Sequence, residues 1–119
     1  MTTHSTSRIL EEIMIKLDYQ KDNLNLRSFL KRNLNKNFLQ KDPLNQVDGF
    51  LGGGLPEDTT FWSKAGLMSQ ARHDAAWWVN NDSLQTLLVV FGNGEKYVKD
   101  ESLFPEISNA VYKYNNNLV

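Results

Sequence analysis

The sequence predicts one α+β domain, in which a three-stranded antiparallel β-meander packs with N-terminal helices and a C-terminal helix. Three observations indicate this fold class. Apolar residues recur at helical spacing near both ends of the chain, they alternate with a period of two in its second half, and 119 residues suit a single domain. We expect residues 1–34 to be helical, 35–58 to form a loop, 59–92 to form the strands and 100–117 to form the last helix.

The first predicted helix carries an apolar stripe, which consists of Ile9, Leu10, Ile13, Met14 and Leu17. Thr3 or Ser5 can cap its first turn, and no capping box with Glu or Gln is present. A second helix is expected after the capping residue Asn25, because its apolar positions, Leu26, Phe29 and Leu30, again have helical spacing.

The segment from Asn33 to Asp58 loses this periodicity and is rich in Gly and Pro, which indicates a long loop. The three expected strands are rich in β-branched and aromatic residues and cover Thr60–Lys64, Ser69–Val79 and Leu84–Phe91. Turns are expected at Gly66–Met68 and at Asn80–Ser83.

The terminal helix is marked by apolar residues at helical spacing, namely Ile107, Ala110, Val111 and Tyr114. Pro105 is tolerable because it lies in the first turn of this helix.

Composition excludes several classes of function. Thirteen Lys and Arg against fourteen Asp and Glu give a net charge of −1, so there is no basic excess for binding nucleic acid. With no Cys, the chain has neither a disulfide framework nor a thiolate metal site, and we expect no cofactor. No apolar run is long enough to span a membrane, and residues 1–8 lack the layout of a signal peptide. The sequence assigns no cellular compartment.

The segment with the most chemical information runs from Phe61 to Ala76. It places Lys64 before a glycine on one strand and a second cation, Arg72, on the next, an arrangement that suits a carboxylate ligand. The small residues Ala65 and Gly66 would let an extended ligand lie along the strand edge. The alternative is an ordinary edge strand with a solvated lysine.

These residues carry a resemblance to a known family. The stretch Trp62-Ser63-Lys64-Ala65-Gly66, continued by Arg72-His73-Asp74-Ala75-Ala76, resembles the Lys-Thr-Gly strand and following hairpin of class A β-lactamase-like serine hydrolases, whose relatives include penicillin-binding transpeptidases. Residues 45–56 are similar to the loop before that strand, and the N-terminal segment is similar to the one after the family's omega loop. The resemblance covers nearly the whole chain but only the C-terminal half of the family's domain.

The resemblance implies roles for individual residues. Lys64 matches the catalytic-motif lysine, which attracts the substrate carboxylate. Ala65 stands where many relatives have a hydroxyl residue, Gly66 keeps the strand end open, and the N–H of Leu67 matches an oxyanion-hole donor. Arg72 is expected to anchor the carboxylate in place of the missing hydroxyl. The implied substrate is a β-lactam or a peptidoglycan-like peptide.

The other motifs of the family, Ser-x-x-Lys, Ser-Asp-Asn and the omega-loop Glu, would precede residue 1. The one literal Ser-x-x-Lys begins at Ser28 and lies among surface cations, so we do not expect Ser28 to be a nucleophile. Ser63 has no plausible base placed near it. His73-Asp74 is not expected to bind a metal, because neighbours in a strand point to opposite faces. Gly52–Gly54 is expected to form a flexible turn, and Trp77, Trp78 and Phe91 to be packing residues.

The incomplete domain leads to two expectations. By resemblance, absent strands would pair beside residues 84–91, so the chain should complete its sheet with a complementary N-terminal fragment or a second copy. The function expected is that of the C-terminal portion of a β-lactamase-like serine hydrolase, inactive alone. The alternative is a non-catalytic binding module that reuses the scaffold and the groove at Lys64 and Arg72.

Overall fold

The computed structural model describes residues 1–16 and 27–117, which form helical layers around an antiparallel sheet. Among these residues the strand order is β1-β2-β3-β4, and the strands are β1 (Lys31–Arg32), β2 (Thr60–Met68), β3 (Ala71–Val79) and β4 (Gln85–Asn93). The meander of β2, β3 and β4 confirms the prediction. The strand count of three is wrong, because Lys31 and Arg32 pair with Trp62 and Phe61 and add a short fourth strand.

The turn expected at Gly66–Met68 is also wrong. These residues belong to β2 and pair with the start of β3, with Gly66 opposite His73 and Met68 opposite Ala71. The chain reverses at Ser69 and Gln70 instead, so Ser69 is not part of a strand. A glycine can lie within a strand, and a Cβ at Gly66 would meet no other atom of the described residues within 4 Å. The site lysine therefore lies within a strand rather than at its end.

The turn at residues 80–83 forms as predicted, because Asn80 organises it. Its side-chain oxygen accepts the backbone N–H groups of Asp82 and Leu84, both at 2.9 Å. Ser83 takes a left-handed conformation with φ of 64°, which completes the reversal.

The N-terminal helix is α1 (Thr3–Glu11), followed by a π-helical turn, η1 (Glu12–Lys16). Its cap is Thr2 rather than Thr3 or Ser5, and it forms a capping box in which the third position is Ser5 instead of Glu or Gln. Leu17 and the predicted second helix start, Asn25 and Leu26, lie outside the described residues. Residues 27–30 are helical, but the helix predicted up to residue 34 is interrupted by β1.

The segment 35–58 is more ordered than a loop. It contains α3 (Lys36–Leu39) and the 3-10 helix η2 (Leu51–Gly54), so the three glycines form a helical turn. A Cβ on Gly54 would lie 1.9 Å from the carbonyl oxygen of Pro105, which shows how closely η2 approaches the C-terminal helix. The glycines are therefore needed for packing.

The chain ends with α4 (Glu95–Lys99), which the sequence did not predict, and α5 (Leu103–Asn115). Pro105 lies in the first turn of α5, as expected. The buried face differs from the prediction, because it is formed by Phe104 and Ser108 with Val111 and Tyr112, whereas Ala110 and Tyr114 are exposed.

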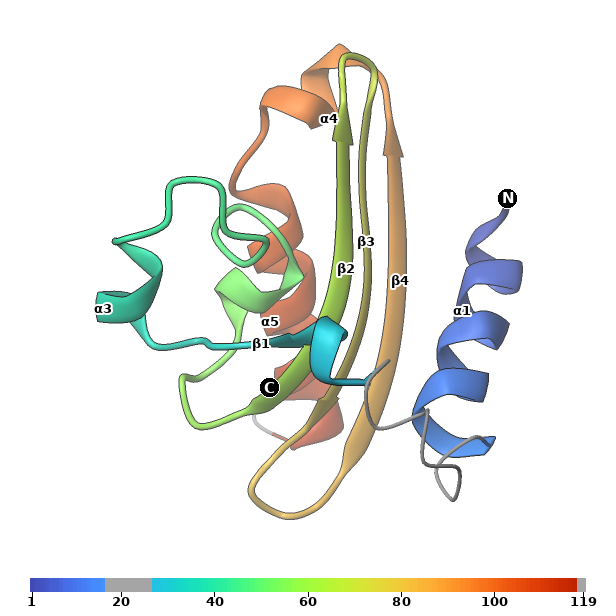
Figure 1. Cartoon of the computed structure of the whole chain (residues 1–119), viewed down its shortest axis with the longest axis vertical. Helices are drawn as coiled ribbons and strands as arrows, with labels where there is room; N and C mark the ends of the chain where they lie inside the picture. The colour runs from blue at the N-terminus through green and yellow to red at the C-terminus, as the bar shows by residue number, and fades with distance from the viewer. Residues whose placement is uncertain (17–26, 118–119) are drawn as a thin grey trace.

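Helices cover both faces of the sheet, with α5 and η2 on one side and α1 on the other (Figure 1). The larger core lies on the α5 side and includes Phe61, Trp78, Leu51 and Phe104, all at most 1% exposed. The smaller core packs Leu10 and Met14 of the N-terminal segment against Trp77. Trp77 and Trp78 are packing residues, as predicted.

Candidate functional site

The predicted site residues lie along the outer edge of β2. The strand β1 pairs only with Phe61 and Trp62, so the rest of that edge has no neighbouring strand among the described residues. Ala65 directs its N–H outward to a side chain of the preceding loop. Because alternate residues of an antiparallel strand direct their N–H groups to the same side, Leu67 also presents its N–H at this edge. The edge therefore offers main-chain donors to a ligand.

The lysine of the motif is exposed at this edge. The Nζ of Lys64 donates to the side-chain oxygen of Gln46 at 3.3 Å and to the carbonyl oxygen of Ala65. The methyl group of Ala65 points the other way, into the larger core. Ala65 thus contributes backbone groups to the edge, while Lys64 contributes a cation.

Gln46, which belongs to no motif of the sequence, lies at the centre of this edge. Its Oε1 accepts the N–H of Ala65 at 3.0 Å, Nζ of Lys64 at 3.3 Å and Nη2 of Arg32 at 3.4 Å. Arg32 also donates to the carbonyl oxygen of Ser63 at 2.9 Å. No local pattern marks Gln46 or Arg32, because both act across long sequence separations.

Arg72 lies near the edge but is buried, with 3% of its surface exposed. Its guanidinium donates to the carbonyl oxygens of Gly49 at 2.7 Å, Tyr97 at 3.1 Å and Val98 at 2.7 Å. It also lies 4.7 Å from the ring centre of Phe50. These contacts tie the segment before η2 to α4, and the carboxylate-anchoring role of Arg72 stays a prediction.

A hollow of about 350 Å³ brings most of the predicted residues together. It is lined by residues of the 43–50 loop, β2, β3 and the turn before α5, among them Lys64, Ala65, Leu67, Arg72 and Gln46. Asp48 and Glu101 add acidic groups to its wall. Gly66 does not line this hollow.

Below the edge, Asp74 is buried on β3, opposite Ala65. Its Oδ2 accepts the N–H of Leu51 at 3.0 Å, while Oδ1 has no partner in the described part of the chain. Burial raises the pKa of Asp74 to about 7, although backbone hydrogen bonds and the charges of Arg32 and Lys64 oppose the rise. Partial burial of Arg32 itself lowers the pKa of its guanidinium, although the charge of Asp74 opposes this.

The two serines considered as nucleophiles have different surroundings. Ser63 is fully buried, and no partner for its Oγ is present among the described residues. Ser28 is exposed on the helical residues 27–30. The ring of His73 lies against that of Phe91, with ring centres 4.2 Å apart and planes tilted by 31°. Within residues 1–16 and 27–117, no three His, Asp or Glu side chains gather as a metal site.

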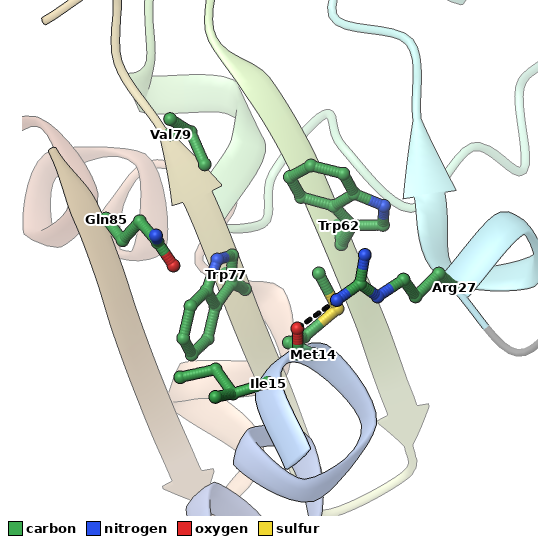
Figure 2. Close-up of a pocket in the computed structure, with 7 residues that line it drawn as sticks. All are labelled: Met14, Ile15, Arg27, Trp62, Trp77, Val79 and Gln85. Atoms are coloured by element: carbon green, nitrogen blue, oxygen red, sulfur yellow. Dashed lines mark hydrogen bonds between the residues drawn. The ribbon is translucent and has the colours of Figure 1, made fainter. Parts of the chain in front are cut away.

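A second hollow of about 350 Å³ lies on the opposite face of the sheet, near the end of η1. Its aromatic wall consists of the cross-strand pair Trp62 and Trp77, and Arg27 closes one side by donating to the carbonyl oxygen of Met14 (Figure 2). It contains none of the predicted site residues.

None of the described helices has the length and apolar character needed to cross a membrane.

Comparison with solved structures supports the fold. A beta-lactamase from Streptosporangium roseum has a TM-score of 0.71 and 19% identity, and one from Burkholderia vietnamiensis has a TM-score of 0.76 and 12% identity. Both are matched over 100% of this chain and 42% of their own length. An ancestral class A beta-lactamase matches with a TM-score of 0.67 and 16% identity, over 92% of this chain and 40% of its own. The chain thus spans about two fifths of the length of these proteins.

Comparison with curated protein sequences finds no match. A model of a protein family, described as the beta-lactamase enzyme family, matches residues 5–115. This match covers most of the chain, including β2 and the edge described above, and agrees with the resemblance in the sequence around Lys64. The chain therefore belongs to the beta-lactamase enzyme family.

Proposed function

We propose that the chain is the carboxylate-binding portion of a serine acyl-transfer site, whose substrate is a β-lactam or a peptidoglycan-like peptide. The observation that carries this proposal is the exposed Nζ of Lys64 beside the outward N–H of Ala65, at the wall of a hollow. A cation next to main-chain donors favours a carboxylate, because charge-assisted hydrogen bonds are the strongest available. The neighbouring N–H of Leu67 would then face the carbonyl oxygen on which charge develops.

The reaction proposed for the intact protein is acyl transfer. A serine oxygen adds to the substrate carbonyl, the C–N bond breaks and the nitrogen takes a proton, and water then hydrolyses the ester. This chain would supply charge stabilisation and positioning for that sequence but no nucleophile. We therefore expect it to be inactive alone, since Ser63 is buried and Ser28 is remote in sequence from the Lys64 strand.

Binding is tested by titrating the ¹⁵N-labelled chain with benzylpenicillin and following the amide signals of Ala65 and Leu67. We expect both signals to shift in a saturable way. Lys64→Met should weaken binding by about tenfold or more, because a hydrogen bond to a charged group is lost. Lys113→Met, an exposed lysine on α5, is the matched control and should bind as the original chain does. Unchanged affinity in the Lys64 variant would refute the site.

Inactivity is tested separately by intact-mass spectrometry after incubation with benzylpenicillin. We expect no acyl adduct. An adduct that disappears in Ser28→Ala or Ser63→Ala would identify a nucleophile and overturn the view that this chain holds only part of the site.

A second candidate function is a non-catalytic binding module. It is favoured by the open edge of β2 beyond Ala65, which can accept an extended peptide as an added strand. Tight binding of an extended peptide along β2, together with no competition from benzylpenicillin, would support this candidate over the first.

A further inference from the structure

The side chain of Gln46 occupies the position on the β2 edge where the proposed function places a ligand oxygen. One atom, Oε1, receives the backbone N–H of Ala65 and the cationic groups of Lys64 and Arg32. These donors come from two segments that are distant in the sequence, β1 and β2. A point at which one main-chain donor and two cations converge is a site for an oxygen with negative charge.

A neutral amide oxygen is a poor match for this set of donors. It has two lone pairs for three donors, and its distances of 3.3 Å to Lys64 and 3.4 Å to Arg32 exceed the usual length of about 2.7–2.9 Å for charge-assisted hydrogen bonds. A carboxylate has two oxygens and a full charge. It would therefore satisfy the same donors better than Gln46 does.

The backbone around Gln46 is held in place, so that only the side chain has to move. Asn45 Oδ1 accepts the N–H of Val47 at 3.0 Å and that of Asp48 at 2.8 Å, and Val47 is buried with 2% exposed. The Gln46 side chain itself is half-buried and borders the hollow. Rotation about its side-chain bonds would free the donors without unfolding the loop.

We propose that Gln46 is a specificity-determining residue of this site, an internal ligand that a carboxylate-bearing molecule replaces more readily than a neutral one. The inference rests on the proposed function of the Lys64 edge and deepens it. A neutral ligand gains little over the amide that it must displace, whereas a carboxylate gains two cationic partners. Gln46 thus lowers affinity for all ligands but lowers it most for neutral ones.

The test compares the original chain with Gln46→Ala and the nearly isosteric Gln46→Glu. Each is titrated with benzylpenicillin and with its methyl ester, which lacks the carboxylate, while the Ala65 amide signal is followed. Removing the internal ligand should tighten benzylpenicillin binding by about tenfold and narrow the preference for the free acid over the ester. Gln46→Glu should weaken benzylpenicillin binding by about tenfold, because its own carboxylate occupies the donors.

Gln40→Ala, an exposed glutamine at the end of α3, is the matched control and should bind as the original chain does. The Ala65 amide gives a check that does not depend on ligand, since its hydrogen exchange should accelerate in Gln46→Ala. If the original chain binds and Gln46→Ala binds no more tightly, the role of Gln46 is refuted while the site stands. If no variant binds benzylpenicillin, the proposed function fails and this inference fails with it.

Discussion

Asp74 shows at the scale of single residues how burial changes the chemistry of a side chain. It lies on β3 beneath the Lys64 edge, is 1% exposed, and has one carboxylate oxygen that accepts the N–H of Leu51. The other oxygen has no partner within the described residues. Since burying an unpaired charge is costly, the folded chain favours the protonated form.

This predicts a pH dependence of stability. The pKa of Asp74 is 3.8 ordinarily and about 7 in the folded chain, so between these values the folded state holds a proton that the unfolded state has lost. The stabilisation is complete below pH 3.8 and is lost as the pH rises towards 7. The free energy of unfolding should fall by at most about 1.4 kcal/mol for each pH unit in this window.

The measurement is urea unfolding across this pH range, compared with Asp74→Asn, which cannot ionise. The difference between the two proteins isolates this carboxyl group from other titrating residues. Parallel pH profiles for the two proteins would show that Asp74 titrates normally.

Arg72, which the sequence predicts as a ligand anchor, also contributes to the stability of the fold. Arg72→Lys would keep the charge but lose the forked contacts with Gly49 and Val98. We expect the free energy of unfolding to fall by about 2 kcal/mol or more, since buried carbonyl groups lose charged donors. Thermal unfolding measures the change, and Arg8→Lys on the exposed side of α1 should alter it by less than about 0.5 kcal/mol. Equal effects of the two substitutions would contradict a structural role of the Arg72 hydrogen bonds.

At the scale of elements, the glycines of η2 and β2 differ in the space that surrounds them. Gly54 is required by close packing, because a Cβ there would lie 1.9 Å from the carbonyl oxygen of Pro105 and 2.4 Å from Oγ of Ser108. Among the described residues, no heavy atom lies within 4 Å of a Cβ placed at Gly66. The first glycine therefore fixes the distance between η2 and α5, while the second only leaves the strand open.

This difference predicts the outcome of two alanine substitutions. Gly54→Ala should lower the free energy of unfolding by about 3 kcal/mol or more, because backbone atoms must move. Gly66→Ala should leave it unchanged or raise it by up to about 1 kcal/mol, because alanine loses less conformational entropy on folding. Urea unfolding followed by tryptophan fluorescence measures both, and similar stabilities for the two variants would contradict the packing argument.

For the molecule as a whole, β4 is the last strand of the sheet. Within the part of the chain that the structure describes, β4 pairs only with β3. Its side chains are mostly half-buried and apolar from Leu87 to Phe91. Such an edge favours pairing with another strand.

We predict that purified chain associates through this edge as its concentration rises, with β4 pairing to a second copy. The register of the sheet directs the N–H groups of Leu87, Val89 and Phe91 outward, and those of Leu88 and Val90 towards β3. Hydrogen exchange of the outward amides should therefore slow as sedimentation velocity reports association, while the inward amides stay protected throughout. A monomer at all concentrations would refute self-pairing and leave a complementary chain as the partner to test.

The candidate site could be predicted from the sequence only where its signal is local. Lys64, Ala65 and Leu67 stand together in one strand, so their resemblance to the family's motif was visible in a short run of residues. Gln46 and Arg32 reach the same edge from separations of about 19 and 31 residues, over which no periodicity operates. The sequence predicts Arg72 as a site residue but does not predict its burial. A single sequence does not show which carbonyl groups surround a guanidinium.

Periodicity and short motifs are local properties, so they predict the α+β class, the β-meander, the position of the terminal helix and the resemblance to the family. Three features are seen only in the folded chain: the fourth strand at Lys31–Arg32, the ordering of η2 against α5 and the place of Gln46 on the β2 edge. These features depend on which distant segments meet. Packing and the pairing of buried polar groups determine which segments come into contact, and no single residue determines this alone.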